Sequence, residues 1–151
     1  TTADAIRFAA AVTGKVLLSK AAVTGGGAHA VNIAGDLSGS LTVQRSTLDG
    51  TSGHGVYVET MTAGTVALSG GAVKGSSAAV KINGAADAFS SVKLANVLAT
   101  GTTDHGVWAT GGTFSGSLTI AGGSVTTAGD AIFFGVAHAD NKKAFARYFR
   151  M

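Results

Sequence analysis

Apolar residues recur along this chain in pairs, with one residue between the two members of each pair. Val56 and Val58 form one pair, and its counterparts are Ile6/Phe8, Val31/Ile33, Val80/Ile82, Val107/Ala109 and Ile132/Phe134. A second pair, Val66 and Leu68, recurs at Val16/Leu18, Leu41/Val43, Val92/Leu94 and Leu118/Ile120. Counterparts are 24 to 27 residues apart, and most are 25 apart. A constant period of this length indicates a repeat architecture.

Each repeat contains three short segments. In the first two, apolar residues alternate with other residues, which is the period of a strand with one buried face. The third is little more than one apolar residue after a short corner, at Val23, Leu48, Val73, Leu98 and Val125. Connectors rich in Gly, Ser, Thr, Ala and Asp turn the chain between segments. Three strands and three corners per repeat describe one rung of a parallel β-helix, with rungs stacked at roughly 4.8 Å.

The predicted fold is therefore an all-β, right-handed parallel β-helix of about five to six rungs over residues 1–138. One rung cannot bury its own apolar face, so stability comes from stacking neighbouring rungs. A β-sandwich gives no reason for the constant register. A leucine-rich repeat needs an Asn/Cys ladder and a helical segment, and the sequence has neither. A left-handed β-helix favours a shorter turn built from hexapeptides, and no such period is present.

The tail, residues 139–151, breaks the strand pattern. Phe145, Tyr148 and Phe149 fall at i, i+3 and i+4, which predicts one apolar face of a short helix, with basic residues such as Arg147 largely elsewhere. We expect this helix to cap the solenoid. The alternatives are a basic element that contacts a membrane surface or an acidic partner, and a segment that packs on a further domain.

The N-terminal end has no residues that resemble a cap, because Ile6 already belongs to a rung. This pattern predicts either a truncated chain or self-association through the N-terminal rung.

Composition narrows the function classes. Cysteine is absent, which excludes disulfides and thiolate metal sites. The net charge of +3 resides in the tail, since residues 1–140 hold seven Lys/Arg and eight Asp/Glu. A nearly neutral repeat body is a poor match to nucleic acid, so no nucleic-acid partner is expected. No apolar run is long enough to predict a membrane span.

One column of residues stands just before the first strand of each rung: Asp4, His29, His54, Ala78, His105 and Asp130. Stacking would place these side chains one rung apart and form a polar ladder. Adjacent imidazoles suggest a shared divalent metal, and an Asp–His pair suggests a general base. The simpler interpretation is a column of polar residues that bond corner backbone groups. We favour this interpretation and predict no catalytic residue, metal or cofactor.

Two aromatic residues, Tyr57 and Trp108, fall at outward positions on either side of Lys81, and they are candidates for a contact site. The acidic residues are scattered over different rungs and faces. Enzymes that use β-helices on polysaccharides need clustered carboxylates. An enzyme is therefore not expected.

The recurring form HGVYV…GTVALSGGAV, with small-residue corners and no cysteine, resembles autotransporter passenger domains of the pertactin-like kind, over residues 1 to about 135. The resemblance implies a β-helical stalk exported to the outer membrane of a Gram-negative bacterium, which serves adhesion, virulence or immune evasion. The basic tail differs from the hydrophobic segment that usually closes such passengers. No functional residue of the family is carried over.

The leading hypothesis is a non-enzymatic, secreted or cell-surface scaffold that presents a binding surface to a protein or glycan on a host or neighbouring cell. A carbohydrate-active β-helix, such as a polysaccharide lyase or tailspike fragment, and a self-assembling solenoid remain alternatives.

Overall fold

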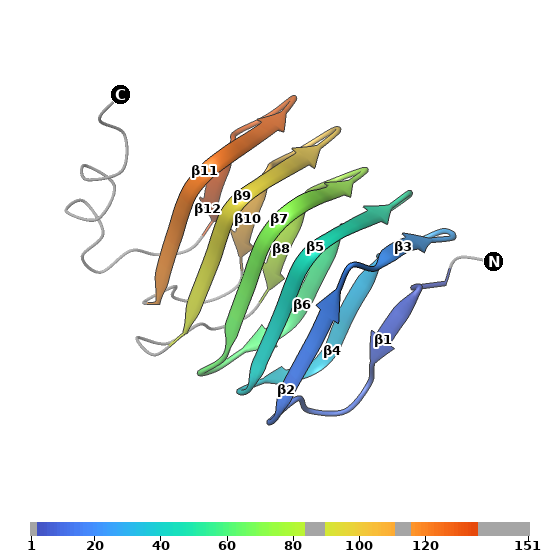
Figure 1. The fold of residues 1–151 in the computed structure, drawn as a ribbon, viewed down its shortest axis with the longest axis vertical. Coiled ribbons are helices and arrows are strands. Elements are labelled where there is room, and N and C mark those ends of the chain that lie inside the picture. The colour runs from blue at the N-terminus through green and yellow to red at the C-terminus, as the bar shows by residue number, and fades with distance from the viewer. Residues whose placement is uncertain (1–2, 84–89, 111–115, 136–151) are drawn as a thin grey trace.

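A computed structural model of the chain describes residues 3–83, 90–110 and 116–135. Within these residues the regular elements are strands in two parallel sheets that face each other (Figure 1). Sheet A has the order β1 (Ile6–Phe8), β4 (Val31–Leu37), β6 (Val56–Met61), β8 (Val80–Asn83), β10 (Val107–Thr110) and β12 (Ile132–Gly135). Sheet B contains β2 (Lys15–Ser19), β5 (Ser40–Gly50), β7 (Thr65–Gly75), β9 (Ser91–Gly101) and β11 (Ser117–Thr127), and β3 (Ala22–Gly25) also pairs with β5.

One strand of sheet A followed by one strand of sheet B makes a rung, so β1 opens rung 1 and β12 opens rung 6. The predicted all-β parallel solenoid is confirmed, with about five turns in the described chain. The predicted right-handedness stays a prediction.

Strand register reproduces the predicted apolar ladders. In sheet A, Val56 pairs with Val31 below and Val80 above, and in sheet B, Leu41 pairs with Val66. These side chains are completely buried. Burial of one such side chain contributes roughly 1.5–3 kcal/mol, and each interior ladder residue is shielded by the rungs on either side. Rung stacking therefore forms the core.

The third apolar position of rung 4 was predicted wrongly. Val73 pairs with Ala99, which is 1% exposed, whereas Leu98 is 56% exposed. Successive strand residues point to opposite faces, so a shift of one residue moves the larger side chain to solvent. Val97, which is 2% exposed, fills the core near this bend instead.

The second and third segments, predicted as separate strands, form one continuous eleven-residue strand in β5, β7, β9 and β11. Each of these strands bends at a residue in the left-handed region, at Arg45 (φ 48°) in β5 and Asn96 (φ 54°) in β9. In β7 and β11 the bend lies at the glycine pairs Gly70-Gly71 and Gly122-Gly123. Strand pairing skips the bend and resumes after it, so four residues separate the last apolar residue of the second segment from the third apolar position in each of these strands.

The opposite corner, where sheet B returns to sheet A, depends on close approach of two chain segments. A Cβ atom on Gly50 would lie 2.0 Å from the carbonyl oxygen of His54. Only glycine permits this contact. This tight corner therefore sets the position of the residue just before each sheet A strand, and these residues form the polar column.

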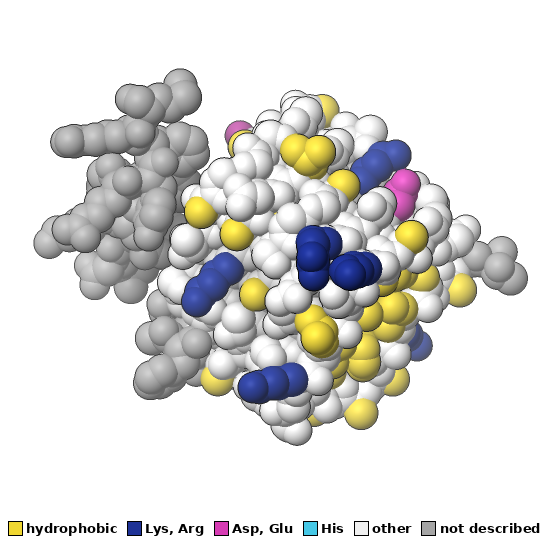
Figure 2. Space-filling model, viewed as in Figure 1, with side chains coloured by type: hydrophobic (Ala, Val, Ile, Leu, Met, Phe, Trp, Pro, Cys, Tyr) yellow, Lys and Arg dark blue, Asp and Glu magenta, His cyan; other side chains and the backbone are white. Residues whose placement is uncertain are grey.

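The outer edge of rung 1 is open on one side within the described chain. Leu17 of β2 is 61% exposed, and apolar side chains gather at the N-terminal end in the right-hand part of Figure 2, where Figure 1 places β1 to β3. The predicted self-association stays a prediction. The predicted helical cap and the domain boundary at residue 138 lie outside the described residues.

Candidate functional site

The first half of the polar column is a ladder of hydrogen bonds from backbone to side chain. The His29 N–H donates to Asp4 Oδ1 at 3.1 Å. The His54 N–H donates to His29 Nδ1 at 2.9 Å, and the Ala78 N–H donates to His54 Nδ1 at 3.1 Å. Each side chain thus accepts the amide proton of its counterpart one rung higher. Ala78 ends the ladder because its methyl group cannot accept.

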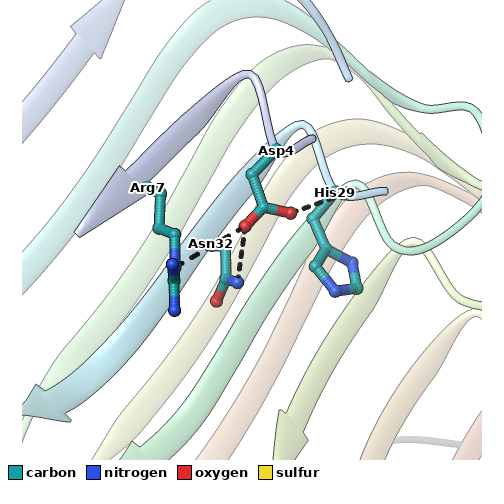
Figure 3. Close-up of polar contacts among 4 residues, drawn as sticks. All are labelled: Asp4, Arg7, His29 and Asn32. Carbon is teal, nitrogen blue, oxygen red and sulfur yellow. Dashed lines mark hydrogen bonds and ion pairs between the residues drawn. The ribbon is translucent and has the colours of Figure 1, made fainter. Parts of the chain in front are cut away.

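Asp4 anchors the lower end of this ladder (Figure 3). Its Oδ2 accepts a hydrogen bond from Asn32 Nδ2 at 2.8 Å, and the Arg7 guanidinium lies 4.0 Å away. Arg7 is 61% exposed, so this ion pair contributes little to stability. The structure thereby places Asp4, with His29 and His54, among backbone donors of the corner.

The two histidines stack face to face, with ring centroids 5.0 Å apart and planes 5° apart. A neutral imidazole has one nitrogen that accepts and one that donates. Because both Nδ1 atoms accept backbone N–H groups, the ring proton of His29 and of His54 lies on Nε2. In this tautomer neither ring keeps a free lone pair to bind a metal ion or remove a substrate proton.

Burial keeps these rings neutral. Burial lowers the pKa of His54 to about 4, and the nearby His29 and Lys81 act in the same direction. Burial also lowers the pKa of His29, although Asp4 opposes this change. The acceptor role of each Nδ1 requires the neutral ring that this shift maintains.

The second half of the column is built differently. His105 stacks on Phe133, with ring centroids 4.4 Å apart, instead of on another histidine. Its Nδ1 is buried, has no hydrogen-bond partner among the described residues and lies 3.9 Å from Asp130 Oδ2, whose side chain is 67% exposed. The structure therefore brings His105 and Asp130 close together, but without the backbone bonds of the first half.

Beside the column runs a row of outward side chains on sheet A. Strand register places Tyr57, Lys81, Trp108 and Phe133 on consecutive rungs of this row. We call these four residues the aromatic strip. All four are half-buried. The row follows the solenoid axis, since consecutive members belong to neighbouring strands.

The Lys81 ammonium lies between two aromatic rings of the strip. Its Nζ is 3.8 Å from the Trp108 ring centroid and 5.8 Å from that of Tyr57. Such cation–π contacts fix the lysine side chain over the rings. Burial lowers the pKa of Lys81, while Asp104 opposes this change.

The strip and the column share their aromatic packing. Tyr57 lies 4.6 Å from the His29 ring, and Trp108 lies edge-on to both His54, at 6.3 Å, and His105, at 4.9 Å. Between His54 and His105 the column contains Ala78, whose buried side chain has no ring. The Trp108 Nε1–H is buried, and none of residues 3–83, 90–110 and 116–135 accepts a hydrogen bond from it.

Sequence reasoning had singled out Tyr57 and Trp108 but missed Phe133 as a partner of His105. The signal was present, since Phe133 stands one repeat after Trp108. Asn32, which binds Asp4, was missed as well. The predicted tail residues Phe145, Arg147, Tyr148 and Phe149 lie outside the described residues.

Among the described residues, no group of three His, Cys, Asp or Glu side chains is arranged to hold a metal ion. Within the same ranges, no helix is long and apolar enough to cross a membrane. Comparisons of the chain with protein-family models, with curated proteins and with solved structures find no match. Function is therefore inferred from the geometry of the site.

Proposed function

We propose that this protein is a non-enzymatic β-solenoid scaffold, secreted or displayed on the bacterial surface, that binds a ligand through the aromatic strip. One observation carries the proposal: three aromatic rings and a lysine occupy consecutive outward positions on a continuous sheet. Aromatic side chains supply large contact area with few rotatable bonds and are enriched at binding interfaces.

The outer face of sheet B offers a contrast. Its outward row contains Leu17, Thr42, Ala67, Lys93 and Thr119 in rungs 1 to 5, and none of these side chains is aromatic. Figure 2 shows basic side chains scattered over a mostly uncharged surface. The concentration of aromatic rings on sheet A is therefore a local feature and not a property of the repeat.

The acidic residues support a scaffold over a hydrolase or lyase. Asp36 accepts from the Thr62 hydroxyl, Asp104 accepts from the Ser77 hydroxyl, and Asp4 accepts from the corner backbone. Each carboxylate thus serves its own rung–rung contact. A glycosidase mechanism needs two carboxylates that flank one bond.

The test is binding of fluorescently labelled protein to cultured epithelial cells and to bacterial cells, measured by flow cytometry. The double variant Tyr57→Ala/Trp108→Ala should lose at least about tenfold in apparent affinity, because it removes the ring surface of the strip. The matched control is Thr42→Ala/Thr119→Ala on sheet B, which should bind as wild type.

Urea denaturation of both variants verifies that each remains folded. Equal binding by the wild type and the folded strip variant would disprove the proposed surface.

A further inference from the structure

We infer that the aromatic strip binds an acidic saccharide chain that lies along the solenoid axis, with a sugar carboxylate on Lys81. This inference deepens the proposed function and rests on it, because it names the ligand class of the same surface.

The shape of the strip selects an extended ligand. Its members come from strands β6, β8, β10 and β12, so each step along it advances one rung, roughly 4.8 Å. Rings occupy rungs 3, 5 and 6, and the lysine occupies rung 4. A linear chain of cyclic units that runs along the axis would meet ring after ring, whereas a compact ligand would contact only part of the row.

The chemistry of the strip selects sugar rings. A pyranose presents a C–H face that packs on aromatic rings and hydroxyl groups at its rim. Polar groups flank the strip on the same sheet face, where the Thr110 hydroxyl donates to Asn83 Oδ1 at 3.0 Å. An apolar ring surface bordered by amide and hydroxyl groups matches both parts of a saccharide.

The position of the strip disfavours an extended peptide. The strip lies on a sheet face, where the strands that carry it are paired with neighbours on both sides from β6 to β10. A peptide that binds by strand addition needs an exposed sheet edge with free backbone groups. Recognition here must proceed through side chains, as it does for a sugar chain.

The charge on Lys81 selects an acidic sugar. Within the part of the chain that the structure describes, no carboxylate lies within ion-pair distance of its ammonium. The charge of Asp104 opposes the lowering of the Lys81 pKa, but the Asp104 carboxylate accepts a hydrogen bond from the Ser77 hydroxyl. A bound carboxylate would give the half-buried ammonium a charge-assisted hydrogen bond on the side that faces away from the Trp108 ring.

The chain contains an intrinsic fluorescent reporter of binding. Trp108 is the only tryptophan in the sequence and lies in contact with Lys81, so its fluorescence reports on the strip alone. The probes are galacturonate, hyaluronan and polysialic acid oligosaccharides, together with carboxyl-reduced forms of the same oligosaccharides. We expect at least one acidic probe to change the Trp108 emission saturably, and its reduced form to bind at least about tenfold more weakly.

Three variants test the role of the Lys81 charge. Lys81→Met keeps the aliphatic stem and removes the ammonium, and it should weaken binding of the acidic probe at least about tenfold. Lys93→Met makes the same charge change on the opposite sheet of the same rung and should stay within about twofold of wild type. Lys81→Arg should retain most of the binding, because it restores the cation.

Three results would overturn the inference: no saturable response to any acidic probe, equal affinity for an acidic probe and its reduced form, or equal weakening by Lys81→Met and Lys93→Met. If the strip variant Tyr57→Ala/Trp108→Ala abolishes cell binding while the saccharide probes fail, the proposed binding surface stands and only the acidic saccharide is excluded. If neither assay responds, both proposals fail.

Discussion

The two halves of the polar column occupy equivalent positions in successive rungs, but their side chains make different contacts. From Asp4 to His54, each side chain accepts a hydrogen bond from the backbone amide of the next rung, and the rings of His29 and His54 stack. From His105 to Asp130 the imidazole packs on Phe133, and its Nδ1 has no hydrogen-bond partner in the described part of the chain.

The difference separates structural polar residues from candidate binding residues. A buried amide that loses its acceptor costs about 1–3 kcal/mol, so the hydrogen bonds of the first half stabilise the fold. Among the described residues, the second half leaves His105 Nδ1 and the neighbouring Trp108 Nε1 unpaired beside an outward aromatic surface, and Asn32 Oδ1 beside Asp4 is unpaired as well. Buried polar groups without partners are rare in folded proteins, and two of these lie where we propose that a ligand binds.

Acidification should weaken the first half most. The pKa of His54 falls from 6.5 to about 4 on folding, so between these values the unfolded chain binds a proton that the folded chain does not. The contribution of neutral His54 to the free energy of unfolding should be complete above pH 6.5. As the pH falls to 4, the free energy of unfolding should decrease by about 3 kcal/mol.

Urea denaturation at pH 7, 6, 5 and 4 measures this dependence. His54→Asn, which keeps an acceptor but cannot gain a proton, should show a flatter profile. Asp4, Glu59, Lys81 and Asp104 surround the two histidines and are unchanged in this control. Parallel profiles for the two proteins would show that His54 does not carry the acid sensitivity.

Removal of the two histidines should affect stability unequally. His54→Ala leaves the Ala78 N–H without an acceptor and a space where the ring was buried, and it should lower the free energy of unfolding by about 2 kcal/mol. His105→Ala breaks no hydrogen bond of the described chain and should cost less than about 1 kcal/mol. Denaturation at pH 7 compares them, and His54→Asn should recover part of the loss. Equal losses for both alanine variants would contradict the division of the column.

The two aspartates that end the column provide a smaller contrast. Asp4→Ala removes the acceptor of the His29 N–H and of Asn32 Nδ2, and it should cost about 1 kcal/mol. Asp130→Ala should leave stability unchanged within error, because its carboxylate is largely exposed and 3.9 Å from His105. Thermal unfolding of both variants at pH 7 makes the comparison. A larger loss for Asp130→Ala would reverse the assignment.

The ladders of the core followed from periodicity, because each inward position depends only on its counterpart one rung away. Leu98 shows where that logic failed. The largest apolar residue near the expected spacing looked like the core residue, but the four-residue corner with Asn96 in the left-handed region fixes Ala99 in that position. Backbone geometry outweighs side-chain hydrophobicity at this corner.

The candidate site was partly visible in the sequence. Spacing placed the histidines in one column and Tyr57 and Trp108 in one row. The spacing could not give the direction of the backbone hydrogen bonds, and thus it could not give the tautomer that removes the free lone pairs of His29 and His54. It also could not show that Lys81 rests on the Trp108 ring, since rotamers are set by neighbours in three dimensions.

The sequence by itself determined the repeat, the parallel strand register and the apolar ladders, because a period of about 25 residues leaves each inward position one stacking partner. The tertiary structure alone decided which polar residues are structural and which remain candidates for binding. Hydrogen-bond direction, ring stacking and desolvation depend on contacts between rungs that are about 25 residues apart in the chain and only roughly 4.8 Å apart in space. Identical histidines at equivalent positions thereby acquire different roles.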